Sequence, residues 1–357
     1  MPIVPLYGHA ELRTIVQGSI ARGSLPSSLL LYGPAGVGKQ RLALWIAQLL
    51  LCEKGAGPCE SCRPCRYVRD VTHPDLHWFF PRPRLKDSNA SPAEIREDLR
   101  DAIAERVSRG GLYPAPAGTE GIFVASIRAI GQTASMAPAM GKRKVFIVGD
   151  AERMVPREGS EDAAGAFLKI LEEPPADTTI ILTSSEVGAL IPTIRSRVSG
   201  IRVPPVADVE VRAFLADSQV SSALKQEDVP PSVDERVVLA AGAPGKLFGG
   251  SAQAEAYGQA RKLLAAASGT RRAERIRLAM AQGTSKARGG YADSLDALSR
   301  LLHDRLRSAV QRGDESSALR ITHAITEVER TKEQTTGNAN PQLLTAVMLM
   351  NIAPDLQ

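Results

Sequence analysis

The sequence predicts an α/β fold with a doubly wound parallel sheet, followed by regions that are helical throughout. The first observation is a glycine-rich turn, residues 33–40, between the apolar run 29–32 and a segment with helical apolar spacing. The second is a pair of apolar runs, 144–148 and 179–184, with the composition of buried parallel strands. The third is helical periodicity from residue 254 onward. Because strands and helices alternate before that point, we expect a parallel sheet covered by helices.

The composition is that of an ordinary globular protein with two or three domains. The chain has 357 residues, of which 43% are hydrophobic and 23% are charged. Its net charge of +5 is modest and spread along the chain, so it is compatible with a nucleic-acid partner without indicating one. The apolar runs are too short to span a bilayer, and residues 1–5 lack the pattern of a signal peptide. We therefore expect a cytoplasmic protein with no membrane partner.

Breaks in the pattern predict three domains. A Pro-Pro pair ends the α/β region, so the first domain is expected to span residues 1–204. A small helical domain follows over 205–252 and ends in a glycine-rich linker. The remaining residues, 253–357, form a second helical domain.

One segment of the first domain, residues 81–121, differs in composition from its surroundings, and we interpret it as an insertion of unknown purpose. Within it, Ser91 and Glu94 have the spacing of a capping box, and a proline stands at the first helical position. This pattern predicts a helix that starts there and continues to about Arg109.

The glycine-rich turn has the pattern of a phosphate-binding loop, in which backbone N–H groups and a helix N-terminus cradle phosphates. Lys39 would reach the outer phosphates of a nucleotide. The next position carries Gln40 in place of the Ser or Thr whose hydroxyl binds Mg²⁺, so we expect the metal chemistry to be damaged. The alternative is a tight strand-to-helix turn that binds nothing. The candidate nucleotide-binding residues are Gly33, Pro34, Gly36, Val37, Gly38, Lys39 and Gln40.

A second nucleotide motif is expected directly after the apolar run 144–148. ATPases of this kind place an Asp there for Mg²⁺, followed by a Glu that polarises the attacking water. In this chain Gly149 occupies the Asp position and Asp150 the Glu position. A shift of register would make Asp150 a metal ligand, but Glu152 would then still follow at the wrong spacing. We expect this motif, too, to lack its metal chemistry.

All four cysteines lie in one short segment with the spacing C-x6-C-x2-C-x2-C. Four thiolates at this spacing suit a tetrahedral Zn²⁺, which would be structural because no coordination position is left for catalysis. Two disulfides are the competing interpretation, although the expected compartment is reducing. Unpaired buried cysteines and an iron–sulfur cluster are weaker alternatives. The candidate metal ligands are Cys52, Cys59, Cys62 and Cys65.

Several segments follow one another in a characteristic order: the phosphate loop, the cysteine cluster, residues 72–75, the L-x-x-L-E-E-P-P motif within 166–175, and the Ser196-Arg197 pair. With these segments in this order, the chain resembles bacterial clamp-loader AAA+ proteins along its length. Within the family, the chain resembles most the delta-prime type of DNA polymerase III subunit, whose ATPase motifs are commonly degraded. The resemblance implies an AAA+ P-loop domain, a small helical lid domain and an all-α collar domain.

The resemblance also implies roles for individual residues. The four cysteines fit the zinc ligands of the family, and the phosphate loop fits its nucleotide cradle, in which ATP or ADP would be bound without hydrolysis. Arg197 fits the arginine finger that such subunits offer in trans to a neighbour's ATP, with Ser196 in support. The family pattern continues with Cys where this chain has Val198, and Gly245 stands where motor subunits carry the sensor 2 arginine, with Lys246 as a weak substitute.

The function implied is that of a stator subunit without intrinsic ATPase activity. Its partners would be gamma/tau and delta subunits in a hetero-pentamer and, through that complex, a sliding clamp and primer-template DNA. Two alternatives remain open. One is an ATP-hydrolysing, motor-type clamp-loader subunit that uses Gln40 and Asp150 as unusual metal ligands. The other is a zinc-bearing, DNA-binding adaptor.

Overall fold

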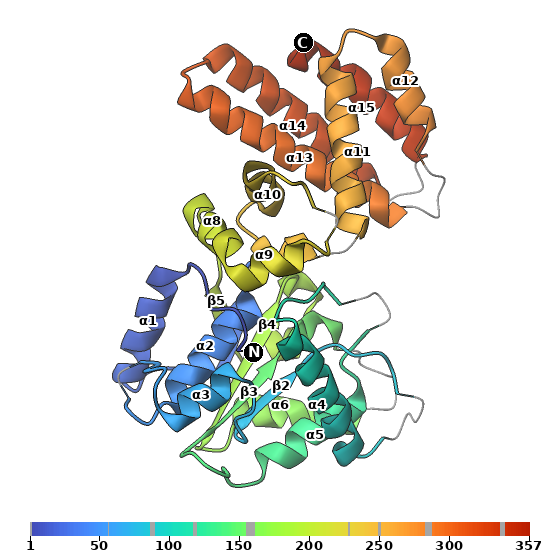
Figure 1. Cartoon of the computed structure of the whole chain (residues 1–357). Helices are drawn as coiled ribbons and strands as arrows, with labels where there is room; N and C mark the ends of the chain where they lie inside the picture. The colour runs from blue at the N-terminus through green and yellow to red at the C-terminus, as the bar shows by residue number, and fades with distance from the viewer. Residues whose placement is uncertain are drawn as a thin grey trace. The chain divides into compact units, whose positions relative to one another are not determined.

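The computed structural model describes residues 2–55, 57–85, 90–116, 120–154, 161–227, 229–248, 251–282, 288–335 and 340–357. The chain forms two compact units. The first contains residues 1–223 and 242–248 and holds the sheet, and the second contains residues 224–241 and 249–357 and is helical (Figure 1). The division into three domains stays a prediction.

A five-stranded sheet forms the centre of the first unit, and all of its strand pairs are parallel. This confirms the predicted fold class. The apolar runs that predicted the sheet form its inner strands, whose residues are buried almost without exception. The spatial order is β2-β3-β4-β1-β5. The strands are β1 (Ser28–Tyr32), β2 (Leu76–Phe79), β3 (Lys144–Val148), β4 (Thr178–Ser184) and β5 (Ser199–Arg202).

The edge strand β5 was not anticipated from the sequence. Three of its four residues are exposed, so it has no apolar pattern to reveal it. It is defined instead by its pairing with β1, in which Gly200 lies opposite Leu30. A Cβ on Gly200 would lie 3.2 Å from the ring of Tyr32, so a small residue suits this edge.

Helices cover the sheet, and α2 is the most deeply buried of them. It contacts β1, β3 and β4, and most of its residues are buried. The helices of this part of the chain are α1 (Ala10–Ala21), α2 (Lys39–Leu51), α3 (Arg63–Arg69), α4 (Pro92–Ser108), α5 (Val124–Ala134), α6 (Glu161–Glu172), α7 (Pro192–Arg195), α8 (Asp208–Ala216) and α9 (Ser218–Leu224). Short 3-10 helices lie at η1 (Ala151–Arg153), η2 (Val187–Ala189) and η3 (Pro244–Phe248).

The capping box predicted in the 81–121 segment is present at the start of α4. The Ser91 side chain accepts a bond from the Glu94 N–H at 3.3 Å, and the Glu94 carboxylate accepts one from the Ser91 N–H at 2.7 Å. The helix ends at Ser108, as predicted to within one residue. Because Ile95 and Leu99 are buried in the same apolar core as the sheet, α4 is an integral part of the first unit.

The second unit has its own apolar core between its helices, in which Leu263, Leu298, Val328 and Leu349 are fully buried. Within the described residues, its helices are α10 (Val233–Ala240), α11 (Ser251–Ser268), α12 (Arg272–Met280), α13 (Arg288–Gln311), α14 (Glu315–Thr335) and α15 (Pro341–Leu356). Helical periodicity therefore predicted this region correctly.

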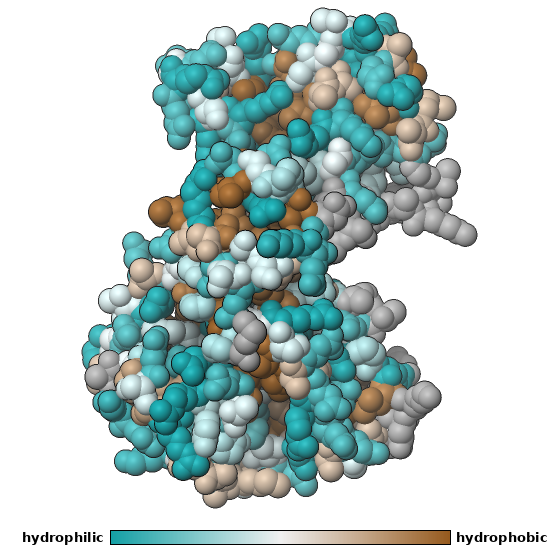
Figure 2. Space-filling model, viewed as in Figure 1, coloured by the Kyte–Doolittle hydropathy of each residue, from teal (hydrophilic) through white to brown (hydrophobic). Residues whose placement is uncertain are grey.

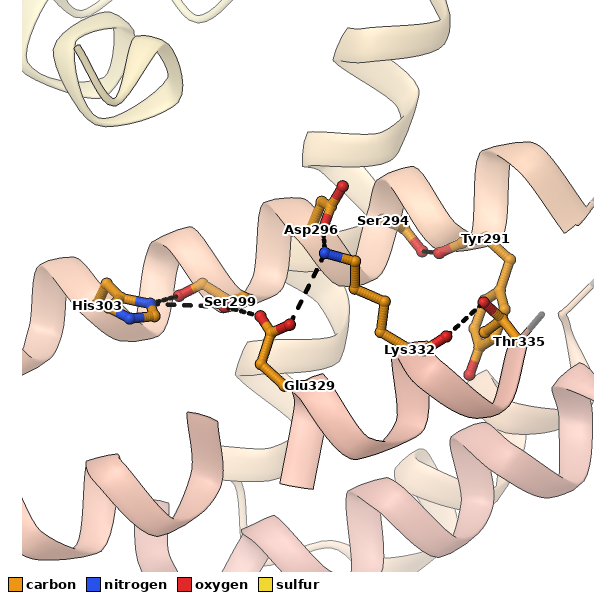
Figure 3. A network of polar contacts seen from close by, with 8 residues as sticks. All are labelled: Tyr291, Ser294, Asp296, Ser299, His303, Glu329, Lys332 and Thr335. Atoms are coloured by element: carbon orange, nitrogen blue, oxygen red, sulfur yellow. Dashed lines mark hydrogen bonds and ion pairs between the residues drawn. The ribbon is translucent and has the colours of Figure 1, made fainter. Parts of the chain in front are cut away.

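Polar contacts join α13 to α14 beside that core (Figure 3). The ammonium group of Lys332 pairs with the carboxylates of Asp296 and Glu329, and Ser299 Oγ donates to Glu329 at 2.7 Å. His303 Nδ1 donates to the Ser299 carbonyl at 2.8 Å. The contacts that cross between the helices, Lys332 with Asp296 and Ser299 with Glu329, need specific partners, so they help to fix how α13 and α14 are aligned lengthwise.

The visible surface of the first unit is mostly hydrophilic (Figure 2). Among the helices described here, none has both the length and the apolar character needed to cross a membrane.

Candidate functional site

The candidate site lies where the carboxyl ends of neighbouring parallel strands meet. Two backbone bonds tie these ends together: Gly33 N–H donates to Ser184 O at 3.2 Å, and Gly149 N–H donates to Phe79 O at 2.8 Å. The glycine-rich turn after β1, the residues after β3 and the end of β4 are therefore adjacent. In open α/β sheets this edge is the usual position of a ligand site.

The glycine-rich turn needs its glycines. Gly36 and Gly38 have φ angles of 81° and 95°, which L-residues with side chains rarely adopt. A Cβ on Gly36 would lie 2.8 Å from the backbone nitrogen of Lys246, and the Gly36 carbonyl accepts a bond from Gly245 N–H at 2.9 Å. The turn is thus packed directly against η3. Gly245, which stands at the position of the sensor arginine, contacts the turn through its backbone.

Lys39 is buried and bound to its own loop. Its ammonium group donates to Gly33 O at 2.9 Å, to Pro34 O at 2.8 Å and to the Ser185 hydroxyl at 2.9 Å. Burial lowers the pKa of Lys39 to about 8, although Asp150 and Glu152 oppose this effect. The ammonium group is therefore satisfied without a phosphate.

Val37, the remaining residue of the predicted cradle, is bonded to a residue near the N-terminus, His9. Its carbonyl accepts a bond from His9 Nε2 at 2.8 Å, and its side chain is buried. Sequence reasoning did not single out His9, because nothing in its immediate sequence marks it as a partner of the loop.

Gln40, at the position where a metal-binding hydroxyl is expected, has both ends of its amide bonded. Its Nε2 donates to Asp150 Oδ2 at 3.0 Å, and its Oε1 accepts from the Trp78 indole at 3.0 Å. The side chain is only 8% exposed. A buried amide whose oxygen already accepts a bond from Trp78 is poorly placed to ligate a metal ion.

Gly149 stands where the second metal ligand, an Asp, is expected. A Cβ at position 149 would lie 2.5 Å from Gln40 Oε1, so the Gln40 amide fills the space that an Asp side chain would need. Since one expected metal ligand is absent and the other is a bonded amide, the residues present do not fit a Mg²⁺ ion bound as in an active ATPase.

Asp150 and Glu152, the remaining acidic candidates, are both engaged by neighbouring residues. Asp150 has a left-handed φ of 50°, and its N–H donates to Thr183 Oγ1 at 3.1 Å. Burial raises the pKa of Asp150, and the Glu152 carboxylate adds to this rise, while Lys39 and Arg106 oppose it. Glu152 Oε1 accepts the Ser185 N–H at 2.9 Å. Glu152 thus links the loop after β3 to the end of β4.

Arg106 from α4 lies beside this network. Its guanidinium carbon is 3.3 Å from the ring centre of Phe80, 3.7 Å from that of Tyr113 and 5.0 Å from that of Trp78. Burial lowers the pKa of Arg106, and cation–π contacts of this kind offset part of the cost of burying the charge. The segment interpreted as an insertion therefore supplies the side chain that packs on Trp78, the indole partner of Gln40.

The four cysteines form one cluster between α2 and α3. Their Sγ atoms all lie within 4.8 Å of one another, and two of the four side chains are buried. Four sulfurs held by Zn–S bonds of about 2.3 Å in a tetrahedron are separated by about 3.8 Å. The cluster is therefore compatible with a structural metal ion such as zinc.

The thiols are free in the structure, with no disulfide among them, so the geometry does not favour the disulfide interpretation. Bonds from the Ser61 hydroxyl and from the backbone of Cys62 lower the pKa of Cys59 to about 5. Burial raises the pKa of Cys65. A bound cation would favour the thiolate form of all four residues, which is the form that ligates metals.

Arg197 and Ser196 lie directly after α7, apart from the groups around Lys39. The Arg197 guanidinium pairs with Glu172 and donates to Thr193 O at 2.9 Å and to Ser196 Oγ at 3.4 Å. Its side chain is 29% exposed. Among the described residues, Arg197 has no bond to the glycine-rich turn.

A family model and several known proteins that match this chain are all DNA polymerase III subunits. A family model described as "DNA polymerase III, delta subunit" matches residues 8–207, more than half of the chain. The DNA polymerase III subunit delta' of Pseudomonas aeruginosa is 35% identical over 170 residues, which cover 47% of this chain and 40% of that protein. The delta' subunit of Bacillus subtilis is 28% identical over 208 residues, covering 58% and 51%.

A DNA polymerase III subunit tau, from Salmonella typhimurium, is 26% identical over 194 residues, which cover 54% of this chain and 24% of that protein. The aligned segments thus span about half or less of each of these relatives.

The close approach of Gln40 and Gly149 predicts that substitutions at the two positions are coupled. Gly149→Asp should lower the free energy of unfolding by about 3 kcal/mol through overpacking. Gln40→Thr should lower it by about 2 kcal/mol, because Trp78 and Asp150 lose their partner. In the double variant Thr makes room for Asp, so its loss should be smaller than the sum by at least about 1 kcal/mol. Urea denaturation of the four proteins measures this.

Gly188→Asp is the matched control, since nothing lies within 4 Å of a Cβ at that exposed position. It should change stability by less than about 0.5 kcal/mol. Strictly additive losses in the double variant would show that the two positions do not share one space.

Proposed function

Because the chain belongs to the family described as DNA polymerase III, delta subunit, we propose that it is the delta-prime-type stator subunit of a clamp loader. Its partners are gamma/tau and delta subunits in a hetero-pentamer. That assembly places a sliding clamp on primed DNA in the cytoplasm. The chain itself hydrolyses no ATP and supplies Arg197 to the ATP site of a neighbouring motor subunit.

The observation that carries this proposal is the contrast between two places in the first unit. Phosphoryl transfer needs a metal, an oriented water and compensating positive charge. Around the glycine-rich turn, the Gln40 amide takes the place of the metal ligands, and Lys39 is bound by loop carbonyls. Arg197, by contrast, lies at the surface with a guanidinium that solvent reaches. The chain thus lacks the metal ligands needed to hydrolyse a nucleotide at its own glycine-rich turn. It retains an arginine, Arg197, that can act on the nucleotide of another subunit.

In this proposal, the glycine-rich turn can bind a nucleotide but does not hydrolyse it. The turn has the left-handed glycines and the helix N-terminus that bind phosphates in this type of loop. ATP or ADP held there would have to draw Lys39 away from its carbonyl partners, and it would be bound without metal-assisted hydrolysis.

The four-cysteine cluster would hold one structural Zn²⁺. The protein as purified, without added metal, should therefore contain about one zinc per chain. A strong chelator should remove it, expose four titratable thiols and lower the melting temperature, because a structural metal contributes to folding stability. Cys65→Ser should purify with little zinc. A zinc-free protein in which fewer than four thiols react under denaturing conditions would support the disulfide interpretation instead.

Replacing Arg197 tests the proposed function directly. In a loader reconstituted with motor and delta subunits, Arg197→Ala should slow hydrolysis at the site it serves by about 10³-fold or more, since a trans arginine is worth that much in related systems. The readout is ATP turnover of the assembly with clamp and primed DNA.

Arg195→Ala is the matched control, because Arg195 is an exposed arginine two residues away in α7. It should leave turnover unchanged. Full turnover with Arg197→Ala in an intact assembly would rule out the arginine-finger role.

A further inference from the structure

The Arg197 guanidinium is held on two sides by residues of its own chain. On one side, Nε donates to the Glu172 carboxylate, and Nη2 forms an ion pair with the same carboxylate oxygen. On the other side, Nη1 donates to Thr193 O at 2.9 Å and, at the longer distance of 3.4 Å, to Ser196 Oγ. The two latter contacts are local, within α7 and its end. Among the residues that the structure describes, Glu172, which is 25 residues away in the sequence, is the one that joins Arg197 to another element.

These contacts leave part of the guanidinium available. Arginine has five N–H donors in a rigid planar fork. Glu172 accepts the Nε donor and forms an ion pair with Nη2, and Thr193 accepts one donor of Nη1. Among the described residues, Nη2 has no partner other than this carboxylate, and the second Nη1 donor makes only the long contact to Ser196. Nη1 and Nη2 together are the end-on pair with which arginine binds a phosphate in bidentate fashion.

The Glu172 carboxylate is anchored to the rigid part of the first unit. Leu171, the preceding residue, is 2% exposed, and its carbonyl accepts a bond from the Ser28 hydroxyl of β1 at 2.9 Å. Pro174 and Pro175 follow Glu173, so α6 cannot continue past this point. The last turn of α6 is therefore fixed to β1, an inner strand of the sheet, and with it the backbone of Glu172.

We propose that Glu172 is a positioning residue for Arg197: it holds one edge of the guanidinium so that the other edge faces the phosphate of a neighbouring subunit. This inference rests on the proposed function. It assigns a role to the first glutamate of the L-E-E-P-P segment, and it places that role on the α6 side of the sheet rather than at the chain's own glycine-rich turn.

The energetics favour a positioning role over a stabilising one. A solvent-exposed ion pair contributes only about 0–1 kcal/mol to folding, and the Glu172 side chain is 44% exposed. Orientation matters far more to the reaction, because a misplacement of about 1 Å can cost about 10² in rate. A long, unrestrained arginine side chain would spend most of its time out of place. The contact with Glu172 therefore contributes more to rate than to stability.

The test measures kcat and KM for ATP in the reconstituted loader. Glu172→Ala should lower kcat at the site that Arg197 serves by about 10²-fold, a smaller loss than in Arg197→Ala, while KM changes by less than about twofold, since the lost contact orients a group that acts in the transition state. Glu172→Gln keeps an oxygen that accepts from Nε, so its kcat should lie between the alanine variant and the wild type. In an Arg197→Ala background, Glu172→Ala should cause no further loss.

Glu173→Ala is the matched control, an exposed glutamate next in sequence, and should leave kcat unchanged. An unchanged or raised kcat in Glu172→Ala would overturn the inference, the latter by showing that the carboxylate competes with the phosphate. If Arg197→Ala also leaves kcat unchanged, the proposed function fails as well. If Glu172→Ala does not assemble, Glu172→Gln takes its place: a lowered kcat with unaltered thermal unfolding supports the inference, and a wild-type kcat overturns it.

Discussion

The bonded amide of Gln40 is the interaction on which the rest of the site depends. It lies between the Trp78 indole and the Asp150 carboxylate, and the missing side chain of Gly149 gives it room. A buried polar group that is satisfied on both sides is costly to disturb, because each broken bond leaves an unpaired partner. The place where an ATPase would bind its metal is therefore part of the polar core of this protein, and Arg106 supports it from α4 through its contact with Trp78.

The positively charged side chains near the glycine-rich turn interact with groups of the chain itself. Lys39 and Arg106 are buried in the first unit, close to the carboxylates of Asp150 and Glu152, so this region is balanced without a metal or a phosphate. Arg197, by contrast, is 29% exposed and forms an ion pair with Glu172. In the proposed function, Arg197 is the cation that acts away from the chain's own glycine-rich turn. This arrangement suits a subunit that acts on the site of a neighbour.

The sequence predicted the elements better than the contacts between them. Apolar runs predicted the buried strands, and Ser91 with Glu94 predicted the start of α4, because burial and capping leave local patterns. The strand β5 was missed because an exposed edge strand has no such pattern. Gln40 and Gly149 were recognised as departures from motifs, but their mutual fit was not, since the residues are far apart in the chain. The contacts of Trp78 and Glu172 are likewise set by the fold, and neither residue type nor spacing reveals a partner.

ATP turnover by the purified chain alone, with and without Mg²⁺, shows most directly whether the glycine-rich turn has lost its metal chemistry. We expect no hydrolysis above the uncatalysed background under either condition, because the Gln40 amide and Gly149 leave no place for the metal. Mg²⁺-dependent hydrolysis that disappears in Lys39→Ala would contradict this expectation. The chain would then be a motor subunit in which Gln40 and Asp150 rearrange to bind the metal.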